Sequence, residues 1–260
     1  MAAAGMRVSR LITAPVKSLG VLTPEHVDLA EGRVLGDREF FLMDDDGQLV
    51  TCTKNGDLLQ YRAEYDSGTS VLAVHGPDGL VRSASTANGE SVAQDFYGLR
   101  TVTGHVVDGW SDLFSDIVGR PVHLVRSASG GFDVVGVTLL GISSVEALRP
   151  DDEAPAIDPR RFRMNVEIRG SSAFEEDSWE GREVRLGSAV VRVGGPVMRC
   201  AATTRHPDSG VSDLGTLKLI GTRRGRQETE LFGVGFYLGV YAEVITPGRV
   251  HVGDDVTVDD

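Results

Sequence analysis

The sequence predicts a mainly β protein with an antiparallel, barrel-like architecture and a few short helices. Short apolar or β-branched runs recur along the chain and are separated by Gly, Asn, Asp and Pro, a pattern typical of strands joined by tight turns. Apolar residues at helical spacing occur in only a few places. A chain of 260 residues can form one large domain or two closely packed ones.

Two hairpins are the clearest predicted strand pairs. In the first, residues 40–43 and 49–53 flank an Asp-rich turn that ends in Gly. In the second, residues 70–75 and 80–83 flank a Pro-Asp-Gly turn. Further strands are expected at residues 7–16, 122–126, 134–142, 165–169, 183–186, 189–193, 236–245 and 251–258.

Three short helices are expected between these strands. Apolar residues of the segment 110–118 recur at helical spacing and Gly119 follows, which predicts a helix with one buried face. The segment 143–146 has the spacing of a capping box and predicts a helix that ends before Pro150. A third helix is expected near residues 214–220.

The predicted strands and helices divide most naturally near residues 119–125, where the first helix ends and a new set of strands begins. This division predicts an N-terminal β-barrel part at residues 1–121 and a C-terminal part at residues 122–260. A second candidate boundary is the Asp- and Pro-rich loop 149–159. We expect the two parts to fold together.

The charge of the chain argues against two classes of partner. The chain has 26 Lys and Arg and 38 Asp and Glu. Its net charge of −12 disfavours binding to nucleic acid or to an anionic membrane. An anionic ligand would need a local basic pocket, for which the Arg clusters at 160–163 and 223–226 are candidates.

Cysteine content and apolar runs indicate a cytoplasmic protein. Cys52 and Cys200 are the only cysteines, so the sequence has no disulfide framework and no ligand cluster for zinc or an iron–sulfur centre. Residues 1–7 lack the apolar stretch of a signal peptide, and the apolar run 231–242 is shorter than the roughly 20 residues that span a bilayer. We therefore expect no membrane insertion.

Cys200 is the leading candidate for chemistry. It follows the strand-like run 189–198, where Pro196 is expected to stop the strand ladder, and it precedes the polar turn 205–210. The neighbouring guanidinium of Arg199 favours the thiolate, the form that attacks electrophiles or binds soft metals. The alternative is that Cys200 is a small buried hydrophobic residue, the commoner role of a single cysteine.

Two N-terminal segments offer groups suited to a phosphate. Lys17 and Ser18 open a turn after a strand and present an ammonium, a hydroxyl and backbone N–H groups. Arg38 precedes a strand and could bind a phosphate or a pterin carbonyl through its guanidinium. Taken alone, each residue is better explained by a structural role, Lys17 as a solvated lysine and Arg38 in an ion pair with Asp37 or a neighbour.

Taken in order, five motifs resemble the MOSC family, named for the C-terminal domain of molybdenum-cofactor sulfurases, in its two-part form. "PVKSLG" and "LGDREFFLMDDDGQLVT" are similar to the N-terminal β-barrel part of the family. "RFRMNV", "FEEDSWEG" and "PVMRCAATTRHPDSG" are similar to its C-terminal part. The resemblance covers roughly residues 7–258 and extends to the amidoxime-reducing components and their bacterial counterparts, which reduce N-hydroxylated substrates at a molybdenum cofactor.

The resemblance implies a site for the molybdenum cofactor. It implies that Cys200 is the thiolate that binds molybdenum, in agreement with the preference of this metal for sulfur. The residues expected to hold the phosphate and pterin share a cationic or hydrogen-bonding side chain: Lys17, Ser18, Arg38, Arg163, Asn165 and Arg199.

The sequence departs from the family pattern at the edge of this site. Met164 stands where many relatives have Pro, Met198 where some have a small polar residue, His206 where Asp is usual, and Thr53 where Arg is frequent. These departures affect the expected substrate and turnover. The sequence also lacks the Cys-rich ferredoxin module of some bacterial relatives, so electrons are expected from a separate ferredoxin- or cytochrome-type protein with its reductase.

Three interpretations follow. The protein could be a molybdenum-dependent reductase of small N-hydroxylated substrates. It could instead carry the cofactor, or a sulfur held as a persulfide on Cys200, for delivery elsewhere. A β-barrel interaction protein without a ligand is the third interpretation, and it leaves the order of five motifs unexplained.

Overall fold

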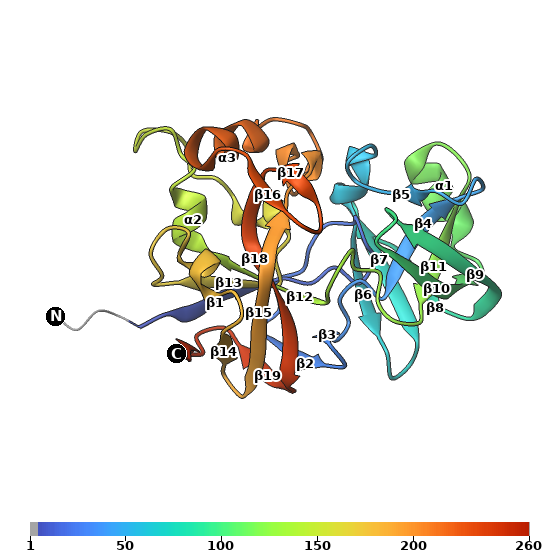
Figure 1. Ribbon diagram of the computed structural model, residues 1–260. Helices are drawn as coiled ribbons and strands as arrows, with labels where there is room; N and C mark the ends of the chain where they lie inside the picture. The colour runs from blue at the N-terminus through green and yellow to red at the C-terminus, as the bar shows by residue number, and fades with distance from the viewer. Residues whose placement is uncertain (1–4, 260) are drawn as a thin grey trace.

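The computed structural model describes residues 5–259 and consists of two β-rich halves that lie side by side (Figure 1). One half is built on a seven-stranded sheet and the other on a five-stranded sheet. Among the named strand pairs of the described residues, only β12 and β13 run parallel. The predicted fold class, mainly β and largely antiparallel with a few short helices, is therefore confirmed.

The seven-stranded half contains the sheet β1-β13-β12-β18-β15-β14-β20. Its strands are β1 (Arg7–Leu11), β13 (Val166–Arg169), β12 (Val137–Gly141), β18 (Tyr237–Thr246), β15 (Ala189–Met198), β14 (Glu183–Leu186) and β20 (Val256–Val258). Two small sheets complete this half: β19 (Gly248–His251), β2 (His26–Ala30) and β3 (Arg33–Val34) form one, and β16 (Gln227–Thr229) and β17 (Gly233–Gly235) form the other.

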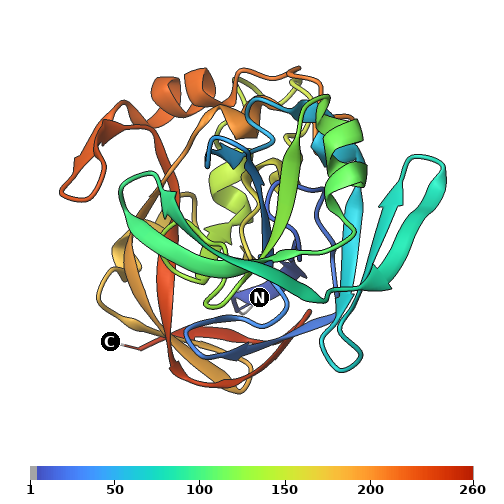
Figure 2. The same cartoon turned by 90° about the vertical axis from the view of Figure 1, so that its right-hand side faces the viewer.

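The five-stranded half contains the sheet β5-β4-β11-β10-β9 and is seen from its own side in Figure 2. Its strands are β5 (Leu49–Val50), β4 (Phe40–Asp44), β11 (Val122–Ser127), β10 (Arg100–Val107) and β9 (Asn88–Phe96). A second, three-stranded sheet consists of β6 (Arg62–Asp66), β7 (Val71–Gly76) and β8 (Gly79–Ser85). The two predicted hairpins are both present here, as β4–β5 and β7–β8.

The helices are short, as predicted. They are α1 (Ser111–Val118), α2 (Ile142–Glu146) and α3 (Thr216–Arg224), with 3-10 turns η1 (Gly56–Gln60), η2 (Pro159–Phe162), η3 (Glu175–Trp179) and η4 (Ala201–Thr204). Helix α1 ends at Gly119, whose φ of 76° is the left-handed conformation that glycine adopts readily. The predicted capping box of α2 is wrong, because Gly141 is the N-cap and the Ser143 hydroxyl donates to the Ser171 carbonyl at 2.6 Å.

Strand pairing crosses the predicted boundary at residue 121. Strands β1 and β2, from the start of the chain, pair with β13 and β19 of the seven-stranded half. Strand β11 follows the boundary but pairs with β4 and β10 of the five-stranded half. The two halves therefore exchange strands, and the division at 121 remains a prediction about family domains.

Four predicted strands differ from the observed ones. The run 49–53 is a strand only in β5, so Cys52 lies in the turn that follows. The expectation that Pro196 stops the ladder is wrong: β15 continues to Met198, because register shifts on both sides of Pro196 accommodate a residue without an N–H. The run 7–16 is a named strand only in β1, and the run 251–258 contains the end of β19, a turn and then β20.

Each half has its own hydrophobic core. Trp179 is fully buried in the core of the seven-stranded half, and Trp110 and Phe114 in that of the five-stranded half. The first core also includes residues from the start of the chain: Val8, Leu11, Val27, Leu29 and Val34. Within residues 5–259 there is no helix with the length and apolar character needed to cross a membrane.

Candidate functional site

All seven candidate residues line one cavity between the two halves of the molecule. Three of them come from the N-terminal segments and four from the segments around η2 and the end of β15. The seven residues are Lys17, Ser18, Arg38, Arg163, Asn165, Arg199 and Cys200. The structure thus brings together side chains that lie up to 183 positions apart, from Lys17 to Cys200.

Three of these residues have left-handed backbone conformations. The φ angles are 76° for Ser18, 50° for Arg38 and 55° for Arg163. Positive φ is uncommon for residues other than glycine and costs about 1–3 kcal/mol where the surrounding structure enforces it. Such strain concentrates at ligand-binding sites, so the shared conformation supports a binding role for these turns.

Lys17 is held by a carboxylate that was not predicted from the sequence. Its Nζ donates to Asp133 Oδ1 at 2.6 Å and lies 5.4 Å from the centre of the Phe96 ring. Burial acts to raise the pKa of Asp133, but the nearby positive charges, chiefly Lys17, outweigh it and the net pKa is lowered. Asp133 lies in the loop between β11 and β12, where no local pattern distinguishes it from a solvated turn residue.

Arg38 is oriented by a buried network. It forms an ion pair with Asp37 and donates from Nη2 to the Arg163 carbonyl at 3.1 Å. Asp37 also accepts from the backbone N–H of Ala14 at 2.7 Å and from the Asn165 amide at 2.9 Å. This network fixes the guanidinium from the N-terminal segment against a turn of the C-terminal segment.

The side-chain amide of Asn165 forms three hydrogen bonds within the protein. Its amide donates to Ile12 O and Asp37 Oδ2, and its Oδ1 accepts from Thr138 Oγ1 at 2.9 Å. The residue is 1% exposed. Although Asn165 lines the cavity, this geometry makes it a residue that positions Asp37, and through Asp37 the Arg38 side chain.

Two of the candidate guanidinium groups have nitrogen atoms without partners at the cavity. Arg163 Nη2 and Arg199 Nε are buried and form no hydrogen bond within the described protein. The other nitrogens of Arg199 face Met164 Sδ at 3.2 Å and the Phe162 carbonyl. Burial lowers the pKa of both arginines, since a buried cation without a counter-charge is unfavourable. An anionic ligand rich in oxygen acceptors would satisfy both groups.

Cys200 is exposed, whereas Cys52 is buried in the same cavity. The Cys200 carbonyl accepts hydrogen bonds from the N–H and the hydroxyl of Thr203, which anchors the start of η4. The sulfur atom lies 4.0 Å from Thr53 Oγ1 of the opposite half. The fold therefore holds the backbone of Cys200 and leaves its thiol accessible.

Two tyrosines also line the cavity and were not predicted. Burial is the main cause that raises the pKa of Tyr241 to about 12, and the pKa of Tyr97 is also raised, although this residue is 59% exposed as a whole. Both phenols therefore keep their protons at neutral pH and can donate hydrogen bonds. Tyr241 lies in a predicted strand, while Tyr97 lies between β9 and β10, in a hairpin that the sequence pattern does not reveal.

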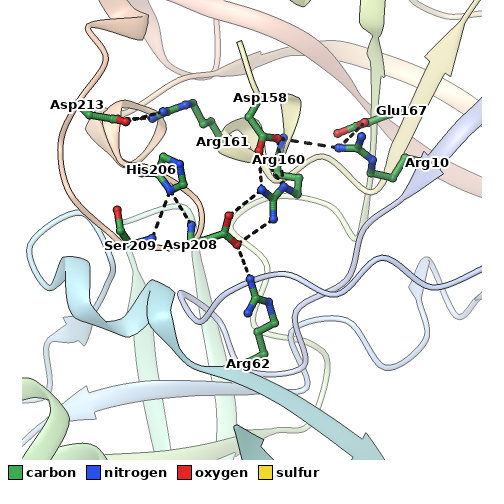
Figure 3. A network of polar contacts seen from close by, with 10 residues as sticks. All are labelled: Arg10, Arg62, Asp158, Arg160, Arg161, Glu167, His206, Asp208, Ser209 and Asp213. Carbon is green, nitrogen blue, oxygen red and sulfur yellow. Dashed lines mark hydrogen bonds and ion pairs between the residues drawn. The ribbon is translucent and has the colours of Figure 1, made fainter. Parts of the chain in front are cut away.

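The two Arg clusters differ in their positions. Arg160 and Arg161 are neutralised by Asp208 and Asp213, and Figure 3 shows this network. Asp208 also contacts Arg62 of the five-stranded half, so the network joins the two halves. The cluster 223–226 does not line the cavity.

The fold and the site together define a class of protein. It is a two-part β protein with a cation-lined cavity and an exposed thiol between its halves. Residues 5–121 match the MOSC N-terminal beta barrel domain, and residues 136–257 match the MOSC domain. Together these models cover nearly the whole chain, and the chain belongs to the MOSC family in its two-domain form.

Three curated relatives place the chain within this family. The molybdenum cofactor sulfurase of Oryza sativa subsp. japonica is 25% identical over 90% of this chain, which spans only 32% of that protein. The mitochondrial amidoxime reducing component 2 of Bos taurus is 26% identical and matches 96% of this chain and 82% of its own length. Its human counterpart is 38% identical over a shorter region, 36% of this chain and 29% of that protein.

Proposed function

We propose that this protein is a molybdenum-cofactor-binding oxidoreductase that reduces N-hydroxylated substrates with electrons from a separate protein. The observation that carries the proposal is the meeting, in one cavity, of an exposed thiol with buried guanidinium nitrogens that have no partner. The names of the cattle and human relatives support the substrate class.

The residues at the cavity fit the anionic cofactor. Lys17, Arg38, Arg163 and Arg199 would hold its phosphate and pterin, together with the backbone and hydroxyl of Ser18. The buried network through Asn165 would keep Arg38 in place. Asp37 and Asp133 balance only part of this positive charge, so an anionic ligand completes the site.

Cys200 would be the protein ligand of the metal, because a thiolate is a soft donor. When bound, the cofactor supplies a two-electron redox centre. In the net reaction the N–O bond breaks, an electron pair and protons enter, and water leaves. The protonated phenols of Tyr97 and Tyr241 are placed to donate hydrogen bonds to a polar substrate in the cavity.

A second candidate function is a carrier of the cofactor or of a persulfide sulfur on Cys200. The exposure of this thiol favours it, since transfer to another protein requires an accessible sulfur. The rice relative is named a molybdenum cofactor sulfurase.

One preparation separates these candidates. Protein made in a host that synthesises the cofactor is assayed for molybdenum by inductively coupled plasma analysis and then supplied with benzamidoxime and dithionite-reduced viologen. Stoichiometric molybdenum with formation of benzamidine supports the reductase. Stoichiometric molybdenum without turnover favours the carrier, and absence of molybdenum contradicts both cofactor-based proposals.

The external donor is tested on the same material. The loaded protein should not oxidise NADH or NADPH by itself, because two cysteines cannot build a four-cysteine cluster and Gly233–Gly239 lacks the spacing of a dinucleotide-binding fingerprint. Turnover with a nicotinamide nucleotide alone would contradict the dependence on a separate electron donor.

A further inference from the structure

A groove of about 780 Å³ lies beside the cofactor cavity, which measures about 160 Å³. Its walls are formed by β15 and β18, by the end of η3, and by the segment 227–232 of the β16–β17 hairpin. Val135 and Tyr241 line both spaces, so the groove and the cavity adjoin. Its volume is in the range of sites for organic molecules.

The floor of the groove is apolar and aromatic. Pro196 contributes aliphatic surface from β15, and Val193 and Val240 lie beneath the floor, each 1% exposed. Phe232 and Tyr241 lie with their ring centroids 6.4 Å apart, at 31° to each other. Two neighbouring aromatic rings present the negative faces that attract an organic cation.

The rim of the groove is acidic. Its two arginines are neutralised, since Arg192 donates to Glu183 at 2.8 Å and Arg224 contacts Asp177. Within residues 5–259, the structure gives no ion pair to four carboxylates that line the groove: Glu180, Glu228, Glu230 and Glu243. This acidic groove therefore carries an uncompensated negative charge above an apolar floor.

Two further details indicate a built site. Oε1 of Glu180 lies 4.0 Å from the point that a Cβ added to Gly195 would occupy. This carboxylate therefore lies close to the part of the floor formed by β15. At the η3 end, Asp177 Oδ1 is buried without a hydrogen-bond partner, and this oxygen can accept from a cationic donor.

We propose that the acidic groove binds an organic cation, namely an amidinium, guanidinium or ammonium group on an apolar body. The carboxylates would pair with the positive charge while Phe232, Tyr241 and the aliphatic floor contact the apolar part. An anion would meet repulsion from the four unpaired carboxylates. A bare metal ion would gain nothing from the aromatic floor.

The shared residue Tyr241 links this cation site to the reaction. A ligand anchored in the acidic groove would have its other end at the cofactor cavity. The preferred substrates would then be N-hydroxylated compounds that carry a second, cationic group on an apolar spacer. This last step rests on the proposed function, whereas cation binding in the groove does not.

The first experiment measures binding without using activity. Benzamidine, as its cation, is titrated calorimetrically into the full chain, with benzoate and benzyl alcohol as probes of opposite and zero charge. Benzamidine should bind and the other two should not, and the affinity should fall as salt is added. Equal binding of benzyl alcohol, or no binding of benzamidine, would overturn the proposal.

Variants locate the binding. The double change Glu180→Gln and Glu243→Gln should weaken benzamidine binding about fivefold or more, through the loss of two partly exposed charge pairs. Phe232→Leu should weaken it about threefold or more by removing an aromatic face. Glu64→Gln, an exposed acid on β6 outside the groove, is the matched control and should leave binding unchanged. Thermal unfolding confirms that each variant is folded, and unchanged binding in both groove variants would contradict the assignment.

The second experiment tests the substrate class on cofactor-loaded protein. Benzamidoxime is compared with an analogue that carries an ammonium group on a short alkyl spacer. The analogue should have the lower KM, and the Glu180→Gln, Glu243→Gln protein should lose that preference while retaining kcat for benzamidoxime. Equal KM values would overturn the substrate assignment, and a complete lack of turnover would instead contradict the proposed function while the calorimetric result stands.

Discussion

Cys200 gains its significance from its surroundings more than from its own segment. The sequence places it after a strand and beside Arg199, but the structure turns the Arg199 guanidinium toward Phe162 and Met164. The Cys200 sulfur instead lies 4.0 Å from Thr53 Oγ1, a residue 147 positions away. A single thiol is thus held where both halves meet.

Replacing this thiol should remove function without unfolding the protein. Cys200→Ser should lose molybdenum and lower reductase activity by more than roughly 100-fold, because loss of even an outer partner of a metal ligand costs about 10- to 100-fold. Its free energy of unfolding should change by less than about 0.5 kcal/mol, since the side chain is exposed. Metal content, viologen-driven turnover and urea unfolding measure these quantities.

Cys52→Ala is the matched control for that experiment. Cys52 is buried and lines the same cavity, and its removal should cost about 1 kcal/mol of packing while molybdenum is retained. Full metal content and full activity in Cys200→Ser would contradict the assignment of Cys200 as the metal ligand.

Glu167 on β13 makes the stability of the protein depend on pH. It is fully buried, its two oxygens have no hydrogen-bond partner, and burial raises its pKa to about 7 although Arg10 lies 3.6 Å away. The folded protein therefore binds a proton between the ordinary glutamate pKa and about pH 7. Stability from this proton is complete at low pH and is lost as the pH rises through about 7.

Glu167→Gln should remove that dependence. At pH 8 the variant should be more stable than the original chain, by up to roughly 3 kcal/mol for a shift of this size, and the difference should shrink toward pH 5. Urea unfolding at several pH values provides the measurement, with Glu64→Gln as an exposed control. Parallel pH profiles for Glu167→Gln and the original chain would show that Glu167 is ionised in the folded protein.

Turns, more than strands, build the candidate site. Ser18, Arg38 and Arg163 each adopt positive φ in a turn, and the strands on either side serve to bring those turns together. Sequence motifs identified these turns because their residue types suit a phosphate. Backbone conformation and the partners Asp133 and Thr138 were not predictable, because they depend on contacts between distant segments.

The turn that presents Arg38 gives a direct test of cofactor binding. Arg38→Ala and Lys17→Ala should each lower molybdenum content, since a charge-assisted hydrogen bond to a buried phosphate contributes roughly 1.5–3 kcal/mol. Arg223→Ala is the matched control, because its guanidinium donates to the Pro150 carbonyl on the surface at 2.8 Å. Equal losses of metal in all three variants would contradict the assignment of the cavity.

Further differences between prediction and structure concern strands that were not predicted, of which β9 and β10 are the longest. The β7–β8 hairpin and helix α1 were predictable from an explicit turn or a regular apolar spacing. Strands β9 and β10 were not, because β9 is exposed along most of its length and has few apolar residues. Strand β10 pairs with β11 and β9 pairs with β10, and a local pattern does not encode this pairing.

The exchange of strands between the halves makes the seven-stranded half depend on segments from both ends of the chain. The first 34 residues supply five buried side chains to the core of the seven-stranded half: Val8, Leu11, Val27, Leu29 and Val34. Burial of one such side chain contributes about 1.5–3 kcal/mol, so the five contribute on the order of 10 kcal/mol. A typical domain is stable by about 5–15 kcal/mol in total, and their loss is therefore decisive.

A fragment of residues 122–260 should consequently fail to fold, because it lacks β1, β2 and β3, which leaves β19 without its partner and β13 paired on one side only. A fusion of residues 5–36 to residues 136–259 through a short Gly-Ser linker should fold, since Val34 N–H already donates to the Gly136 carbonyl at 3.1 Å. Circular dichroism and the dispersion of amide proton signals distinguish the two outcomes. A cooperative unfolding transition in the 122–260 fragment alone would show that the two sequence domains are independent, and that the exchanged strands add little to the core they complete.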